Sequence, residues 1–247
     1  MRLPLFYFSQ IFLAASLLYG AVAQADNSTN LPPSADLHYS IQARQSHLPL
    51  SGEAFVKWQL SGTKGSQKYS VITETRAMLV GKILDASSYG TIDSFGLAPD
   101  KFVEKRYGKA ESVSQFDRIS NTIRFTESAA TYPIKGGEQD RTSATWQLVA
   151  LARAMPEKFI TGSEWKMLVA GRRDADPWSF KVAGKDTLRT AIGDVATVHF
   201  IKAPPPDSKD QQIELWLAPA LEWYPVRLKF SDADGDFVDQ TISSIKK

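Results

Sequence analysis

The sequence predicts an all-β, mainly antiparallel fold, in which a large curved sheet or open barrel holds one main helix packed in its concavity. Three observations support this class. Only residues 139–155 have the pattern of a long helix, and most of the remaining chain alternates apolar and polar residues with the period of a half-buried strand. With 247 residues, of which 43% are hydrophobic and 23% charged, the chain can bury a large β core.

The first 25 residues are expected to be a secretory signal peptide. Arg2 supplies an early positive charge, an apolar run follows at residues 11–19, and small residues permit cleavage after Ala23 or Ala25, of which we favour the latter. The alternative is an uncleaved membrane anchor. The uninterrupted apolar run is well short of the roughly 20 residues that span a bilayer, so a periplasmic location is expected.

After the signal peptide, residues 26–36 are expected to form a mobile leader because they are polar and proline-bearing, and residues 37–247 a single β-rich domain. Alternating segments predict strands at residues 37–42, 54–60, 69–79, 81–95 with a kink or bulge, 101–107, 111–117 and 122–126. Glycine, proline and polar residues predict the turns between them at residues 50–52, 61–66, 96–100 and 118–121. Together these segments predict an antiparallel meander.

The predicted helix, residues 139–155, has a signal at each end. Asp140 is a suitable N-cap, a Gly136-Gly137 pair ends the preceding segment, and Pro156 stops the helix. One apolar stripe at helical spacing contains Ala144, Leu148, Leu151 and Met155. Trp146 and its neighbours widen this stripe until little polar surface remains. We therefore expect the strands to wrap around this helix.

Beyond the helix, the chain returns to strand patterns. Strands are predicted at residues 165–170, 178–182, 187–190, 196–201, 212–217, 226–230 and 237–243. The proline-rich residues 203–210 could pass for a linker, but strands flank them closely on both sides. A long exposed hairpin loop is the preferred interpretation.

The order of these elements carries a resemblance. Its motifs are residues 96–99 (GLAP), Gln139-Asp140 with Ser143 opening the helix, residues 213–217 (IELWL), residues 224–227 (YPVR) and a closing glycine-centred hairpin. In this order they resemble the secreted bacterial family called domain of unknown function 3108, over residues 37–245. The resemblance implies a curved antiparallel sheet with a helix in its mouth, similar to the periplasmic lipoprotein-localisation carriers. It implies no reaction, and fold alone does not determine function.

Composition excludes several kinds of function. The chain has no cysteine, which removes disulfides, thiolate metal sites and cysteine nucleophiles, and only three histidines. Without the first 25 residues it has 28 basic and 27 acidic residues, so no electrostatic case for nucleic acid exists. We expect no metal, no cofactor and no enzymatic activity.

Two polar motifs have a structural and a functional interpretation. The carboxylates of residues 232–236 (DADGD) could hold a hard cation, but Gly235 stands fourth where a helix-loop-helix calcium loop needs its glycine sixth. A hairpin turn is preferred. Ser143 could be a nucleophile, but no Gly-x-Ser-x-Gly motif surrounds it, and capping of the helix with Asp140 explains it.

Aromatic residues supply the candidate ligand site. The chain has six tryptophans and thirteen phenylalanines, spread through both halves as they would be if they lined one interior. The candidate ligand-binding residues are Trp58, Trp146, Leu148, Trp216, Trp223 and Tyr224. The alternative, that these side chains simply fill a large β core, is modestly preferred.

The predicted function is a non-enzymatic periplasmic binding or carrier module for an apolar or acyl ligand in envelope upkeep. Expected partners are a lipid, an acyl chain, a lipoprotein or an envelope protein. The alternative is a structural or protein-interaction domain with a filled core and an exposed apolar patch. A hydrolase is the least favoured hypothesis, since it needs carboxylates, histidine and serine gathered in one cleft.

Overall fold

A computed structural model describes residues 29–63, 65–204 and 210–247. The predicted signal peptide and most of the proline-rich loop, residues 205–209, therefore lie outside the described part. Within that part, no helix has the length and apolar character needed to cross a membrane.

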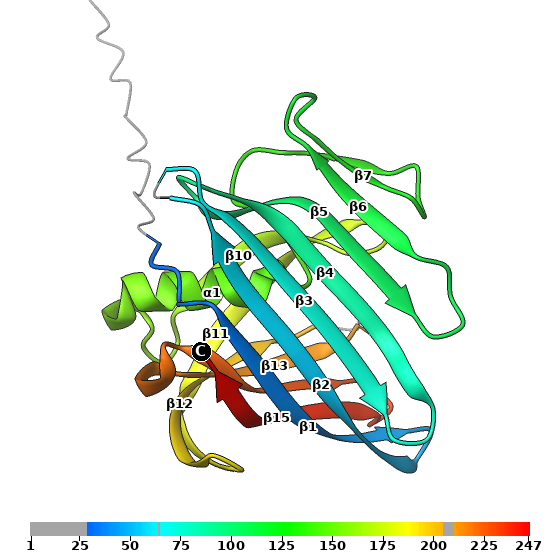
Figure 1. The fold of residues 1–247 in the computed structure, drawn as a ribbon, viewed down its shortest axis with the longest axis vertical. Helices are drawn as coiled ribbons and strands as arrows, with labels where there is room; N and C mark the ends of the chain where they lie inside the picture. Colours follow the sequence, from blue (N-terminus) through cyan, green and yellow to red (C-terminus); the bar gives the residue numbers. More distant parts are fainter. Residues whose placement is uncertain (1–28, 64, 205–209) are drawn as a thin grey trace, which may run out of the picture.

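The first half of the chain is an antiparallel meander, as predicted (Figure 1). Its strands are β1 (Ala35–Gln45), β2 (Leu48–Ser61), β3 (Lys68–Ala77), β4 (Gly81–Asp93), β5 (Gly96–Arg106), β6 (Ser112–Asp117), β7 (Thr122–Phe125) and β8 (Thr131–Pro133). Buried and exposed residues alternate along most of these strands, so one face of the sheet packs inward and the other meets water.

The second half surrounds the helix and adds to the same sheet. Its elements are β9 (Gln139–Asp140), α1 (Ser143–Ala154), the short 3-10 helix η1 (Pro156–Lys158), β10 (Glu164–Ala170), β11 (Ala175–Thr190), β12 (Gly193–Lys202), β13 (Gln212–Ala218), the 3-10 helix η2 (Pro219–Leu221), β14 (Tyr224–Ser231) and β15 (Phe237–Lys246). β1 pairs with β15, which joins the halves into one fifteen-stranded sheet running from β8 to β9. Only the β9–β10 pair is parallel among the described strands, and the sheet does not close by hydrogen bonds. The predicted fold class is confirmed.

Side chains draw the two ends of the open sheet together. The Ser114 hydroxyl on β6 donates to the Gly171 carbonyl beyond β10 at 2.6 Å. Arg172 forms ion pairs with Glu127 and Glu104 across the same seam. An apolar cluster with Phe116 and Ala170 at its centre packs beneath it. These contacts bring the open sheet close to a barrel at this seam.

The helix is shorter than predicted. It begins at Ser143, not Gln139, because Gln139 and Asp140 pair with β10 as strand β9. Asp140 still serves the helix start, since its Oδ1 accepts the backbone N–H groups of Thr142 and Ser143, both at 2.8 Å. The Ser143 hydroxyl in return accepts the Asp140 N–H at 2.9 Å. The N-cap is therefore Thr142 and not Asp140 as predicted, although the Asp140 side chain does bind the first free N–H groups at the helix start.

Two predicted turns are wrong because they lie inside strands. Residues 50–52 belong to β2, and the chain reverses instead at Ser46 and His47, whose φ angles are 50° and 66°. Two positive φ values make the mirror-image turn that matches strand twist, and neither residue is the glycine that usually marks it. Residues 96–100 likewise belong to β5, and the chain turns at residues 94–95.

Two other local predictions hold, and one does not. The register of β4 against β5 shifts between Tyr89 and Gly90, which is the predicted bulge. Residues 232–236 form the β14–β15 turn, with Gly235 at φ 88°. The prediction of two separate strands at residues 178–182 and 187–190 is wrong, because both segments lie in one strand, β11, which continues through a bulge at Gly184.

Residues 30–34, within the segment predicted to be a mobile leader, contact the core. The Asn30 N–H donates to the Ala150 carbonyl at 3.0 Å, and the Pro32 carbonyl accepts from the Trp58 indole at 3.0 Å. The Pro33 carbonyl accepts from Tyr224 at 2.8 Å. These contacts hold the entry to β1 against α1 and the sheet.

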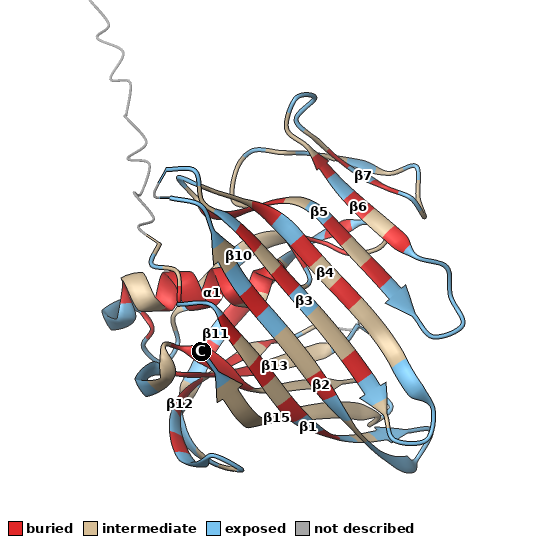
Figure 2. Ribbon diagram, in the orientation of Figure 1, coloured by how far each residue is buried: buried red, intermediate tan, exposed pale blue. Residues whose placement is uncertain are grey.

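Two apolar clusters fill the space around α1. The first joins Trp146 and Ala150 to strands of both halves of the sheet, β1, β2, β3 and β5 as well as β12, β13, β14 and β15. The second joins Leu148, Leu151 and their neighbours to β11, β12 and β13. Figure 2 shows the helix buried along most of its length. Because residues of one helix pack in clusters that include strands of both halves of the sheet, α1 connects the halves as the sequence pattern predicts.

Candidate functional site

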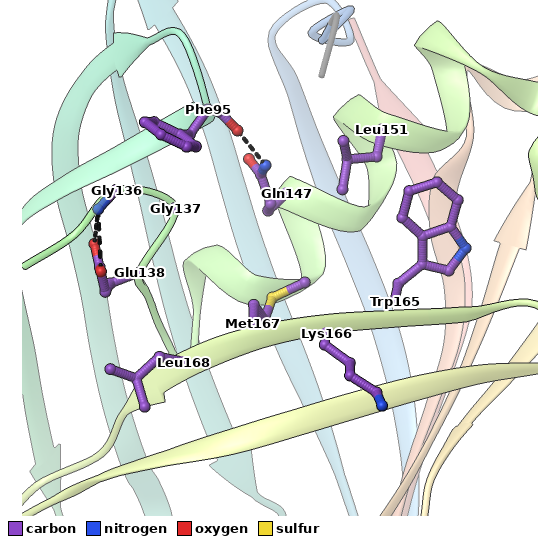
Figure 3. A pocket seen from close by; sticks show the side chains of 10 residues that line it. All are labelled: Phe95, Gly136, Gly137, Glu138, Gln147, Leu151, Trp165, Lys166, Met167 and Leu168. Carbon is purple, nitrogen blue, oxygen red and sulfur yellow. Dashed lines mark hydrogen bonds between the residues drawn. The ribbon is translucent and has the colours of Figure 1, made fainter. Parts of the chain in front are cut away.

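A pocket of about 330 Å³ opens beside α1 (Figure 3). It lies between the helix, the β4–β5 turn, the segment before β9, and β10. Its lining consists of Phe95, Gly136, Gly137, Glu138, Gln147, Leu151, Trp165, Lys166, Met167 and Leu168. These residues come from four segments that are separated in the sequence.

Gln147 connects the helix wall of the pocket to the β4–β5 turn. Its side-chain Nε2 donates to the Phe95 carbonyl at 2.7 Å, and its Oε1 accepts the Leu97 N–H at 2.8 Å. Both ends of the amide are therefore engaged with strand backbone. This arrangement positions the Phe95 ring over the pocket, where Figure 3 shows it opposite the helix.

Gly136 lets the opposite wall approach the Phe95 ring. A Cβ atom at Gly136 would lie 2.4 Å from that ring, and its φ of 108° disfavours any L side chain. The Glu138 carboxylate accepts the N–H groups of Lys135 at 2.6 Å and Gly136 at 3.0 Å. The glycine turn is thus held in place by a carboxylate that is itself largely buried.

The Gln147 and Glu138 side chains of the pocket wall bind backbone, and the lining combines polar and apolar groups. Leu151 from α1 and Met167 from β10 point toward each other, and the Lys166 amine points away (Figure 3). Trp165 stacks on Phe159 with ring centroids 4.2 Å apart. The arrangement can take up an apolar group and has no acid, base and nucleophile gathered for chemistry among the described lining residues.

The six ligand-binding residues predicted from sequence lie in the two core clusters, and none lines the described pockets. Trp58 stacks on Trp146 at 4.4 Å between ring centroids, with Tyr224 edge-on to Trp146 at 6.2 Å. All three are buried. They form a packed aromatic layer between the helix and β2, so their role as ligand contacts stays a prediction.

Trp216 belongs to the first cluster, with Trp146 and Tyr224, whereas the flanking residues of β13 belong to the second. Strand alternation places Trp216 on the other side of the strand from these flanking residues. There it lies between the His199 ring, stacked at 4.2 Å, and the Arg227 guanidinium, 4.6 Å above its ring. Trp216 is thus enclosed by polar side chains as well as by the cluster, and its role as a ligand contact stays a prediction.

Leu148 and Trp223 do not line the pocket. Both belong to the second cluster, and Phe159 contacts Trp223 at 6.0 Å while stacking on Trp165 at the pocket wall. Sequence reasoning missed Phe95, Trp165 and Met167. Trp165 was visible as a strand aromatic, but no sequence signal says that its strand borders an opening.

A buried polar chain lies on the other side of the helix start. Tyr69 Oη is 3.0 Å from Ser88 Oγ, and the Ser88 hydroxyl donates to Asp140 Oδ2 at 2.5 Å. All three residues are buried. Burial raises the pKa of Asp140 to about 6, against the opposing effect of its hydrogen bonds. The chain ties α1 to β3 and β4, and the Ser143 hydroxyl is engaged with Asp140 as capping requires.

Several solved structures are similar to this chain. A β-barrel-like protein of domain of unknown function DUF1849 from Brucella abortus matches with a TM-score of 0.53 at 10% identity, covering 88% of this chain and 98% of that one. An exported protein with a YmcC-like fold from Bacteroides fragilis has a TM-score of 0.40 at 9% identity, covering 89% and 100%. A domain named for outer membrane lipoprotein sorting from Vibrio parahaemolyticus has a TM-score of 0.29 at 9% identity, covering 87% and 85%. At such identities the first match shows a shared fold and nothing further.

No curated protein matches the sequence. The family model for the protein of unknown function DUF3108 matches residues 38–242, as the motif order predicted, and the chain belongs to that family.

Proposed function

We propose that this protein is a non-enzymatic binding module of the bacterial cell envelope, which holds an apolar or acyl ligand in the pocket beside α1. The observation that carries the proposal is the pocket itself, where Leu151, Met167 and Trp165 supply apolar side chains and the Gln147 and Glu138 side chains are bound to backbone. Small-molecule sites in proteins combine apolar and aromatic side chains with a few polar groups.

The volume of the pocket limits the ligand. About 330 Å³ is at the lower end of the range for ligand sites, so the pocket suits one chain or part of one. The aromatic clusters behind it are close-packed, with Trp58, Leu148 and Phe200 fully buried. The ligand therefore binds at the mouth of the sheet and does not fill a barrel interior.

The envelope location rests on the predicted signal peptide, residues 1–25, which supports export. The absence of cysteine fits a chain without a lipid anchor at its new N-terminus. A mature protein that moves freely in the periplasm is what a carrier of apolar ligands requires.

The test is binding of dodecanoate to the processed protein, measured by native mass spectrometry and by quenching of tryptophan fluorescence. Met167→Trp, whose larger side chain would fill the space facing Leu151, is expected to abolish binding. Glu164→Trp is the matched control, because Glu164 is an exposed residue of the same strand and does not line the pocket.

The result that supports the proposal is stoichiometric uptake by the wild type and by Glu164→Trp, but not by Met167→Trp. Uptake that is equal in all three proteins would place the ligand elsewhere. A wild-type protein that takes up neither dodecanoate nor phospholipid would refute the carrier function and favour the interaction domain, for which the exposed apolar residues described next are the specific observation.

A further inference from the structure

Large exposed apolar side chains concentrate at one end of the molecule. Of the eleven such residues in the described part of the chain, six lie at or beside the ends of three hairpins: Leu48, Leu50, Met78, Leu79, Val80 and Tyr107. Leu79 is 93% exposed, Met78 77% and Val80 52%. Scattered apolar residues on a surface are ordinary, but a group confined to adjacent loops marks an interaction site.

The topology puts these three hairpins side by side. The strand order runs β6-β5-β4-β3-β2-β1, so the β1–β2, β3–β4 and β5–β6 turns all project from the same end of the sheet (Figure 1). Backbone hydrogen bonds connect neighbours, from Met78 N–H to the Ser51 carbonyl at 3.0 Å and from Tyr107 N–H to the Ile83 carbonyl at 2.9 Å. We call this set of turns the hairpin rim.

Basic residues lie beside the apolar ones in each turn of the rim, and the β5–β6 connection also contains the exposed Glu111. Arg76 and Lys82 enclose residues 78–80, and Arg106 and Lys109 enclose Tyr107. Arg44 precedes the first turn and is exposed, as are the other four. The carboxylates that pair with them, at Glu74, Asp85 and Glu104, lie further back along the strands than the apolar tips.

We propose that the hairpin rim docks onto a lipid bilayer that carries anionic headgroups. An apolar tip ringed by cations matches the layering of such a membrane, where acyl chains lie beneath a negatively charged surface. Tyr107 has the amphipathic ring typical of the interface between them. Protruding turns can enter a soft bilayer, whereas no described pocket lies among the rim turns to receive a protein segment.

Acidic residues set the limit of this surface. The neighbouring β14–β15 turn projects from the same end and contains Asp232, Asp234 and Asp236. Asp236 accepts the Ser46 N–H at 2.6 Å, so it lies against the first turn of the rim. Repulsion there makes the β3–β4 turn, which is farther along the sheet, the main point of insertion.

Docking in this way leaves the pocket beside α1 free. The pocket is at the β4–β5 turn, and the rim is at the opposite end of β4, whose thirteen residues span about 40 Å. The two ends can therefore act independently, and the membrane inference does not depend on the proposed ligand.

The test is co-flotation of the processed chain, with signal-peptide removal verified by intact mass, on vesicles of phosphatidylglycerol and phosphatidylethanolamine or of phosphatidylcholine alone. Binding to the anionic vesicles is expected at low salt and weakens at high salt. Met78→Ser with Leu79→Ser is expected to weaken binding at least tenfold. Arg76→Gln with Lys82→Gln is expected to weaken it about fivefold per charge.

Ile119→Ser is the matched control, since Ile119 is 99% exposed in the β6–β7 turn at the other end of the strands. It should bind as the wild type does. Failure of the wild type to bind anionic vesicles at low salt would overturn the proposal, as would unchanged binding by the Met78/Leu79 variant. Equal loss in Ile119→Ser would also overturn it, because binding would then follow general surface hydrophobicity. Dodecanoate uptake is measured on the same rim variants. A variant that loses vesicle binding but still takes up dodecanoate has an intact pocket, so the membrane inference and the proposed ligand binding are tested separately.

Discussion

Replacement of Asp140 by asparagine tests the buried polar chain at the start of α1. Asparagine keeps an oxygen to accept the Thr142 and Ser143 N–H groups and adds an amide toward Ser88, but it cannot ionise. In the native protein the pKa of Asp140 is raised to about 6 from 3.8 by burial. A raised carboxyl pKa means that the folded state holds a proton that the unfolded state has lost.

The sign of the effect follows from that difference. The stability contributed by protonated Asp140 is complete below about pH 4, falls as pH rises toward 6, and is lost above it. A shift of about two units corresponds to about 3 kcal/mol. The free energy of unfolding of Asp140→Asn, minus that of the wild type, is therefore expected to rise by about 2 kcal/mol between pH 4 and pH 7.

Urea denaturation followed by tryptophan fluorescence at several pH values measures this difference. Subtracting the two proteins cancels titrations that they share, such as those of Glu74 and Glu222, whose pKa values are lowered by their basic partners. Asp117→Asn is the control of opposite sign, because hydrogen bonds from Ser120 lower the pKa of Asp117. A difference between wild type and Asp140→Asn that stays constant from pH 4 to pH 7 would refute the reasoning.

Three further substitutions test the packing and turns by urea denaturation at pH 7. Trp58→Ala should lower the free energy of unfolding by about 3–5 kcal/mol, since it opens a cavity against Trp146; a loss below 1 kcal/mol would contradict close packing there. Gly96→Ala should cost about 1–3 kcal/mol, because its φ is 111° and its Cβ would lie 2.4 Å from Gln147 Oε1; a neutral result would show that the turn is not held by that amide. His47→Gly should stabilise by about 0.5 kcal/mol, as glycine relieves a φ of 66°, and destabilisation would argue against the turn at residues 46–47.

Local patterns in the sequence were sufficient for the fold class. Alternation with a period of two is visible in the printed chain wherever one sheet face is buried, so most strands were found, including the bulged β4. The helix was found for a similar reason, because residues 144, 148, 151 and 155 recur at its period. Burial of one face imposes these patterns, and they need no knowledge of distant residues.

The turns and the helix start depended on pairing with other strands. Ser46 and His47 form a turn because β1 and β2 align Gln45 with Leu48, a register that local composition does not reveal. Gln139 and Asp140 look like a helix start, yet pairing with β10 draws them into the sheet. In each case, hydrogen bonds across strands outweighed a weak local preference.

The candidate site belongs almost wholly to the tertiary structure. The aromatic composition predicted that tryptophans would gather in one interior. Trp58 does stack on Trp146, but both rings are packed in the core and do not line the pocket. The pocket instead lies where four separate segments leave space between them, lined by Phe95, Gly136, Leu151 and Met167 among others. The sequence by itself determined which faces are apolar, whereas an opening depends on how well separate elements pack together, and that fit exists only in the folded chain.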